Sequence, residues 1–422
     1  MSKIKLNNVD LAWLRMESPT KPMMITVVLE FNGLVDYDKL IADLRVTLAR
    51  YRRFRQRIVQ PQKIFQRPYW EDDPDYRVED HVERLELPEP VNEAALEELV
   101  NQKMNTMLDF TYPLWMVTMV DNYPAGSILV VRVHHCIADG ISLLGVLLQM
   151  TRPSSEDDAD QGDATPKLSQ RALNRKPSTT EIIAAIASIF FRRPDPPTRL
   201  KGKLGTRKRA VYSKPLSVPE IKVIAKANQA TINDVLMAAA AGAFRRYIEE
   251  HNDARKPNIN AFVLVNMRGA SFDEELGNKF GLVFLPLPLD RGQPLERLNV
   301  IKQNMDLLKA SAEYAATYVL LIILGGVPAW MEHLATLFLD TKGTVVATNV
   351  PGPRRELSLA GAPIRSIRGA VPQSGRIGVG LSFISYNNQL VVGLNADVGL
   401  IPDPERFIEL YSEEFKSFQN LL

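Results

Sequence analysis

"VHHCIADGIS", residues 133–142, contains two of the five histidines of this chain. His134 and His135 stand side by side at the end of a run of β-branched and apolar residues, which predicts a central strand. The apolar run that comes next predicts a helix, so Asp139 is placed to cap that helix and Gly140 permits a tight turn before it. A strand, a sharp turn and a helix are therefore expected here.

The two adjacent histidines are expected to have different functions. Side chains alternate along a strand, so His134 and His135 point to opposite sides. One is expected to face a reactive cavity, while the other packs or holds the turn. The two histidines and Asp139 are three possible zinc ligands, but their opposed directions and the single nearby thiol, Cys136, disfavour a metal site. From the residues alone, a catalytic histidine and a satisfied core histidine remain alternatives.

The composition is that of a globular protein without a strong charge bias. The chain has 422 residues, of which 45% are hydrophobic and 24% charged, and its formal net charge is +2. This balance disfavours a nucleic-acid-binding protein. Cys136 is the single cysteine, so there is no internal disulfide framework, and a reducing compartment is indicated. The N-terminal residues lack the apolar core of a signal peptide, and a cytoplasmic location is predicted.

One uncharged segment tests whether the chain crosses a membrane. Residues 314–331 carry no charge and reach the lower length limit of a spanning helix. Gly325, Gly326 and Pro328 interrupt the last third of this segment. A buried helix is therefore predicted rather than a membrane span.

Two α/β halves are predicted on either side of a linker. The first half, residues 1–152, contains the histidine pair, and the second half is residues 211–422. The linker, residues 153–210, has an acidic polar loop, an apolar helix and a basic, proline-containing stretch in that order. Thr231 and Asp234 predict a capping box at the start of a helix in the second half. Strands are predicted in that half at 259–267, 343–350, 378–386 and 389–396.

Several ordered motifs carry a family resemblance. HHCIADG matches the HHxxxDG signature of the acyltransferase superfamily related to chloramphenicol acetyltransferase and to condensation domains of peptide synthetases. That signature alone indicates only the superfamily. Other stretches extend the match along nearly the whole chain, and the ordered set resembles the bacterial wax ester synthase/diacylglycerol acyltransferase family. These are MESPTKPMMI (16–25), RFRQR (53–57), PLW (113–115), ND (233–234) and NVPGP (349–353).

The resemblance implies an α/β fold of two chloramphenicol-acetyltransferase-like mixed-sheet lobes, with the active site in a tunnel between them. It also implies that His135 is the general base, with an alcohol entering from one side and an acyl-CoA thioester from the other. A hydroxyl is a poor nucleophile unless its proton leaves during attack, and a neutral imidazole accepts that proton at cytoplasmic pH. The imidazolium then protonates the departing CoA thiolate, so Cys136 need not act as a nucleophile.

Further site residues follow from the same resemblance. Asp139 is expected to pair with an arginine, for which Arg268 is the candidate. Asn233 is expected to donate a hydrogen bond near the developing oxyanion or to fix the start of its helix. No metal is expected, and no cofactor other than acyl-CoA as co-substrate. The predicted catalytic set is His135, His134, Asp139, Gly140 and Asn233, and the predicted substrate-binding set is Pro113, Trp115, Asn278 and Arg268.

The implied function is transfer of a fatty acyl group from acyl-CoA to a long-chain alcohol or diacylglycerol, giving wax ester or triacylglycerol. Such substrates partition into lipid, so peripheral association with a membrane or lipid droplet is expected, and residues 181–209 are a candidate contact. A helix docked on its own protein is the alternative for that segment. Two other functions stay open: a related enzyme that acylates a polyketide alcohol or an amine, and a lipid-binding protein without turnover.

Overall fold

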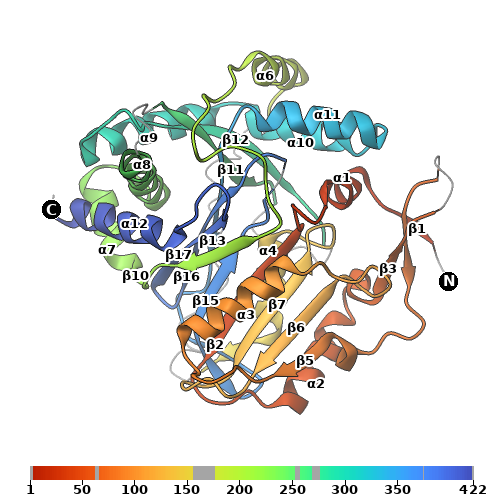
Figure 1. Cartoon of the computed structure of the whole chain (residues 1–422). Helices are drawn as coiled ribbons and strands as arrows, with labels where there is room; N and C mark the ends of the chain where they lie inside the picture. The colour runs from red at the N-terminus through yellow and green to blue at the C-terminus, as the bar shows by residue number, and fades with distance from the viewer. Residues whose placement is uncertain are drawn as a thin grey trace.

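The chain folds into two lobes, each built on a mixed β-sheet with helices packed against it (Figure 1). The structure is a computed structural model. The acidic loop predicted within the linker lies largely outside the described residues. The structure describes residues 3–61, 66–154, 176–251, 257–268, 276–373 and 375–420.

The first sheet has seven strands in the order β5-β6-β7-β2-β15-β14-β8. A small three-stranded sheet, β1-β4-β3, lies beside it. The predicted central strand is β7, which pairs with β6 on one side and β2 on the other. The strands are β1 (Ile4–Lys5), β2 (Met24–Phe31), β3 (Gln56–Val59), β4 (Tyr69–Asp72), β5 (Val82–Leu85), β6 (Trp115–Val120), β7 (Ile128–His134), β8 (Arg152–Pro153), β14 (Leu357–Leu359) and β15 (Ala362–Ala370).

Two strands of the first sheet come from the second half of the chain. β15 runs antiparallel to β2, with Ile367 opposite Leu29, and β14 continues the sheet beyond it. Ion pairs stabilise this register of β15 against β2, because Arg365 and Arg368 of β15 both pair with the buried Glu30 of β2. The predicted lobe boundaries therefore differ from the structure here, because residues 357–370 belong to the first sheet although they fall within 211–422.

The second sheet also has seven strands, in the order β10-β17-β16-β13-β11-β12 with β9 paired to β17. The four strands predicted in the second half are confirmed as β11, β13, β16 and β17. β9 starts inside the predicted linker, so the second lobe begins slightly earlier than expected. The strands are β9 (Lys208–Tyr212), β10 (Leu216–Ser217), β11 (Ile259–Asn266), β12 (Phe280–Leu287), β13 (Val345–Pro351), β16 (Val379–Tyr386) and β17 (Gln389–Asp397).

Helices cover the sheets, and most of them begin at a polar cap. The predicted capping box at the start of α8 is confirmed, since Thr231 and Asp234 bond each other's backbone. The α-helices are α1 (Asn8–Met16), α2 (Tyr37–Leu48), α3 (Glu93–Asn105), α4 (Gly140–Met150), α6 (Thr179–Phe191), α7 (Val218–Ala227), α8 (Ile232–Glu250), α9 (Pro294–Ala310), α10 (Glu313–Leu324), α11 (Ala329–Asp340) and α12 (Pro404–Gln419).

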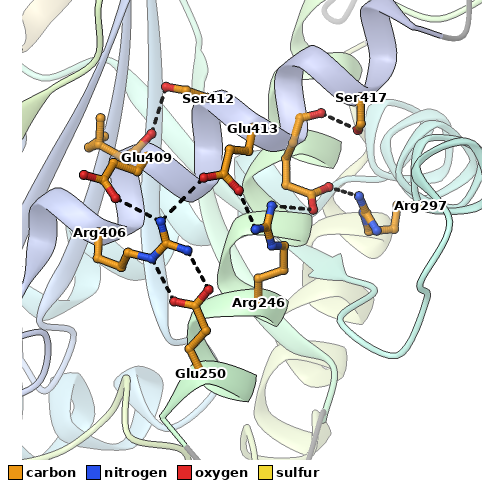
Figure 2. Close-up of polar contacts among 10 residues, drawn as sticks. Arg246, Glu250, Arg297, Arg406, Glu409, Ser412, Glu413 and Ser417 are labelled. Atoms are coloured by element: carbon orange, nitrogen blue, oxygen red, sulfur yellow. Dashed lines mark hydrogen bonds and ion pairs between the residues drawn. The ribbon is translucent and has the colours of Figure 1, made fainter.

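An ionic network joins α8, α9 and α12 on the second lobe (Figure 2). Arg406 of α12 makes two hydrogen bonds to Glu250 of α8, at 2.7 and 2.9 Å. The buried guanidinium of Arg297, on α9, pairs with Glu414 of α12. Gly242 of α8 leaves the space for this buried pair, because a Cβ at that position would overlap the Glu414 carboxylate. The network stands apart from both cavities described below and stabilises the helical layer.

The uncharged segment 314–331 is divided as predicted. α10 ends at Leu324, the chain turns at Gly325 and Gly326, and α11 begins at Ala329. No single helix among the described residues is long and apolar enough to cross a membrane. α9 and α10 pass a test of length and composition only when taken together, and they are bent by 62° relative to each other.

Candidate active site

The site is built on the turn between β7 and α4. β7 ends at His134, and residues 135–137 form a turn before α4 begins at Gly140. Asp139 caps α4 as predicted, because its carboxylate accepts a hydrogen bond from the Ser142 backbone N–H at 2.9 Å. The strand therefore ends between the two histidines, and the side chain of His135 leaves the sheet.

The imidazole of His135 is held on its face and on one edge. Its ring stacks on the indole of Trp13 with the ring centroids 4.0 Å apart and the planes 9° apart. Its Nδ1 lies 2.8 Å from Oδ1 of Asn278. Its side chain is almost fully buried, with 5% of the residue exposed. Because Asn278 comes from the second half of the chain, the ring is positioned by both lobes.

Asn278 fixes which nitrogen of His135 carries the proton. The amide Nδ2 of Asn278 donates to the His135 carbonyl oxygen at 2.7 Å and to Oδ1 of Asp10 at 3.3 Å. Those two acceptors leave Oδ1 as the amide atom that faces the ring, so Nδ1 of His135 must be the donor. Nε2 then holds the lone pair, and no described residue hydrogen-bonds it. This is the tautomer that a general base requires.

Burial keeps the His135 ring neutral. Removal from water lowers the pKa of His135 from 6.5 to about 4, while the nearby Asp139 carboxylate acts in the opposite direction and offsets part of the effect. At neutral pH the ring is therefore uncharged and ready to accept a proton.

The rate of the reaction is expected to depend on pH according to this low pKa. Only the neutral ring accepts a proton. The titration of His135 should therefore leave kcat/KM unchanged between about pH 5 and pH 8, and kcat/KM should fall below about pH 4. The pH dependence of kcat/KM measures this directly, with circular dichroism at each pH to show that the chain is still folded. An acid limb centred near the ordinary histidine pKa of 6.5 would contradict the assignment.

His134 has a structural environment. It is fully buried, its Nδ1 accepts the Cys136 backbone N–H at 3.1 Å, and its Nε2 lies 3.3 Å from a Glu17 carboxylate oxygen. It lines neither of the cavities below. Of the two functions left open by the sequence, His134 therefore holds the turn, and its place in the predicted catalytic set has no support in the geometry. Cys136 is also sealed from solvent, and burial raises the pKa of its thiol well above the usual value.

The predicted pairing of Asp139 with Arg268 is present and joins the two lobes. The two side chains form a buried ion pair, and Oδ2 of Asp139 also accepts the Lys279 backbone N–H at 3.0 Å. Arg268 in addition donates to the Gly277 carbonyl oxygen, so one guanidinium fixes the segment that leads into Asn278. Arg268 lines neither cavity.

Three residues around the turn were not predicted as site residues. Arg53 pairs with the fully buried Asp10 at 2.6 Å and donates to the Ile137 carbonyl oxygen at 3.0 Å, which holds the turn after His135. Asp10 and Trp13 lie three residues apart on α1, so they face the same side of that helix. Arg53 belongs to the RFRQR stretch, which was the one available signal; nothing in the sequence linked α1 to His135.

Two apolar cavities meet at His135. The larger has a volume of about 180 Å³ and lies between the lobes, with α4 and the first sheet on one side and β13 and β16 on the other. The smaller has a volume of about 130 Å³ and is enclosed by α1, β11, β12, α10 and α11. Both are lined by His135, Leu264, Val371 and Pro372. A group at the His135 ring is thus accessible from two separate spaces.

The remaining predicted residues divide between these cavities and the surrounding protein. Trp115 and Gly140 line the larger cavity, and the Trp115 indole also stacks on the buried His81 with the ring centroids 4.4 Å apart. Pro113 is buried beside them but lines neither cavity. Asn233 lies in the first turn of α8 and lines neither cavity. Within the described residues, no group of three or more His, Cys, Asp or Glu side chains is arranged to hold a metal ion.

Comparison with known proteins identifies the family. The model of the wax ester synthase/diacylglycerol acyltransferase catalytic domain matches residues 6–192, and that of the WS/DGAT C-terminal domain matches residues 276–419. A probable diacylglycerol O-acyltransferase, tgs1, of Mycobacterium tuberculosis (strain CDC 1551 / Oshkosh) is 28% identical, over 94% of this chain and 92% of that one. Wax ester synthase/diacylglycerol acyltransferase 9 of Arabidopsis thaliana is 27% identical, over 81% and 82%.

Solved structures share the fold. The wax ester synthase/diacylglycerol acyltransferase from Marinobacter aquaeolei VT8 superposes with a TM-score of 0.72 at 23% identity, covering 99% of this chain and 98% of that chain. The first condensation domain of the calcium-dependent antibiotic synthetase superposes with a TM-score of 0.68 at 16% identity, covering 98% and 97%. The predicted fold of two mixed-sheet lobes is confirmed. On the two matching family models, the chain belongs to the wax ester synthase/diacylglycerol acyltransferase family.

Proposed function

We propose that this protein transfers a fatty acyl group from acyl-CoA to the hydroxyl of a long-chain alcohol or a diacylglycerol. One observation carries the proposal: His135, whose Nδ1 is held by Asn278 so that Nε2 is left as the acceptor, lines both apolar cavities. Two water-insoluble chains need two apolar spaces, and a bimolecular reaction between them needs the reacting ends to meet at one base. The chain's membership of the family supports the same chemistry.

In the proposed step His135 acts as general base and then as general acid. The hydroxyl oxygen attacks the thioester carbonyl carbon while its proton moves to Nε2, which gives a tetrahedral intermediate. The C–S bond then breaks, and the imidazolium returns the proton to the departing CoA sulfur, so the ring ends as it began. The low pKa of His135 makes the imidazolium a stronger acid than usual, which favours the second transfer. No covalent acyl-enzyme is required.

The surrounding residues position the base rather than react. Asn278 fixes the tautomer of His135, and Trp13 fixes the plane of its ring. The ion pair of Asp139 with Arg268 holds together the two chain segments that carry His135 and Asn278. We assign Gly140 and Trp115 to the wall of the larger cavity, where they contact one of the two chains. Asn233 has no part in this proposal, because it lines neither cavity.

The decisive experiment is product analysis with purified protein. Palmitoyl-CoA is supplied with hexadecanol, with a diacylglycerol and with a short alcohol in separate reactions, and free thiol and ester are quantified. Ester formed in step with thiol release supports the proposal, and the ratio of rates gives the acceptor preference. Thiol release with an amine acceptor instead would favour the related enzyme. Lipid bound without any ester would favour a protein without turnover.

We also propose that the protein works in the cytoplasm at the surface of a membrane or lipid droplet. The linings of both cavities are largely apolar, which suits substrates that partition into lipid. α6, which overlaps the predicted contact segment 181–209, exposes Phe191 almost completely, at 89%.

A further inference from the structure

We propose that α6, α10 and α11 form one face that lies on an anionic lipid surface, and that the acceptor passes from that lipid into the smaller cavity between α10 and α11. This inference rests on the proposed function, because it names the route of one substrate to His135. The three helices lie together at one end of the molecule, next to α1 (Figure 1).

The first observation is a set of exposed apolar side chains on these helices, called here the apolar patch. On α11, Trp330 is 66% exposed and Leu334 is 58% exposed, one helical turn apart. Phe190 of α6 stacks on Phe338 of α11 with the ring centroids 5.6 Å apart, so α6 and α11 share the surface. Contiguous exposed apolar residues mark a contact site in a folded protein. The apolar patch comprises Phe190, Phe191, Ile322, Ile323, Trp330, Met331, Leu334 and Phe338.

The second observation is the charge around the apolar patch. α10 and α11 contain three acidic residues, Glu313, Glu332 and Asp340, and all three are buried. The exposed charges at the margin are basic: Arg193 follows α6, and the backbone of the exposed Arg376 bonds Asp340 at the end of α11. The fourth acid on these helices, Glu181 in the first turn of α6, is half-buried and accepts the Ser178 backbone N–H at 2.7 Å. A surface that is apolar at its centre, with its acids buried or held in a helix cap, and basic at its edge matches a bilayer with anionic head groups.

The third observation is that the same helices form the wall of the smaller cavity. Leu320, Leu321 and Leu324 of α10 line it, as do Thr336 and Leu339 of α11. One layer of helix thus separates the apolar patch from the space that leads to His135. A long-chain alcohol or diacylglycerol dissolves in lipid, whereas the phosphates and ribose of acyl-CoA keep that substrate's head group in water. The smaller cavity is therefore the one suited to the acceptor.

A lipid surface is preferred over a second copy of this chain because of the composition of this face. Specific protein interfaces carry polar groups that are hydrogen-bonded across the contact, together with a polar rim. The patch offers leucine, isoleucine, methionine and aromatic side chains, with basic residues at its margin, which is the pattern of an interfacial surface. A dimer formed through this face is the competing outcome, and the experiment below distinguishes it.

The test uses a double charge insertion with a matched control. Trp330→Glu with Leu334→Glu is compared with Leu307→Glu, a substitution of a 71%-exposed leucine on α9 outside the patch. Binding to phosphatidylcholine vesicles with and without phosphatidylglycerol is measured by flotation. The double variant should bind mixed vesicles about tenfold more weakly or worse, and the control should bind as wild type. Arg193→Glu should lower binding only to the vesicles that contain phosphatidylglycerol.

Turnover separates entry of the acceptor from simple attachment. The double variant should lose about tenfold or more of its rate with a diacylglycerol held in vesicles, and keep its rate with a short, water-soluble alcohol. Equal loss with both acceptors, or unchanged vesicle binding, would overturn the proposal. So would a lipid-free dimer in wild type that the double variant dissociates, measured by sedimentation. If wild type forms no ester with any acceptor, the proposed function fails, while flotation still decides the lipid contact.

Discussion

His135→Ala is expected to lower kcat for ester formation by about 10²–10⁴-fold, the usual contribution of a general base. The substitution removes the imidazole that lines both cavities and leaves the lobes joined by Asp139 and Arg268. The measurement is CoA thiol release from acyl-CoA in the presence of an alcohol, under saturating concentrations of both substrates.

The matched control for this prediction is His251→Ala. His251 follows α8, lies 3.4 Å from the Asp403 carboxylate through its Nε2 and lines neither cavity. Its loss should leave kcat within about twofold of wild type. Near-normal turnover of the His135 variant, with its thermal unfolding unchanged, is the result that would remove His135 from the mechanism.

Asp139→Ala is expected to lower the free energy of unfolding by about 3–5 kcal/mol, because it leaves the Arg268 guanidinium buried without its counter-charge. The same change removes the cap of α4 and the acceptor of the Lys279 N–H. Urea unfolding followed by circular dichroism measures the loss. Activity should fall as well, since the segment before Asn278 is no longer fixed.

Asp36→Ala is the matched control. Asp36 also caps a helix, bonding the Lys39 backbone N–H at 3.1 Å, but it is exposed and has no buried arginine. Loss of a helix cap alone costs about 0.5–2 kcal/mol. The difference between the two variants therefore isolates the inter-lobe ion pair, and equal losses in both would show that the pair contributes nothing beyond the cap.

Local patterns were sufficient to predict most elements of the fold. Runs of β-branched residues gave the strands β7, β11 and β17, and the capping residues of α4 and α8 were read correctly from Asp139 and Thr231. The placement of β15 in the first sheet was not predicted. Its register depends on Arg365 and Arg368 pairing with Glu30. These residues lie far apart in the chain, and the spacing of apolar residues along one strand does not predict such a contact.

The site was predicted only in part, because some of its residues are brought together by contacts between distant parts of the chain. His135 and Asp139 belong to the HHxxxDG motif, Arg268 was a candidate from its place after a strand, and the expected ion pair of Asp139 with Arg268 is present. Trp13 stacks on the ring through the tertiary packing of α1, which also contacts α10 and α11, and such packing leaves no signature in the sequence around it. The hydrogen bond that orients His135 likewise joins residues on different lobes.

The shared first sheet has a consequence for synthesis of the chain on the ribosome. β2 is completed on one side by β7, which is made soon after it, but its other edge stays unpaired until β15 emerges near the end of translation. An unpaired strand edge pairs readily with other chains. We therefore expect the nascent N-terminal half to need chaperone protection, and a fragment truncated before Leu357 to aggregate rather than fold.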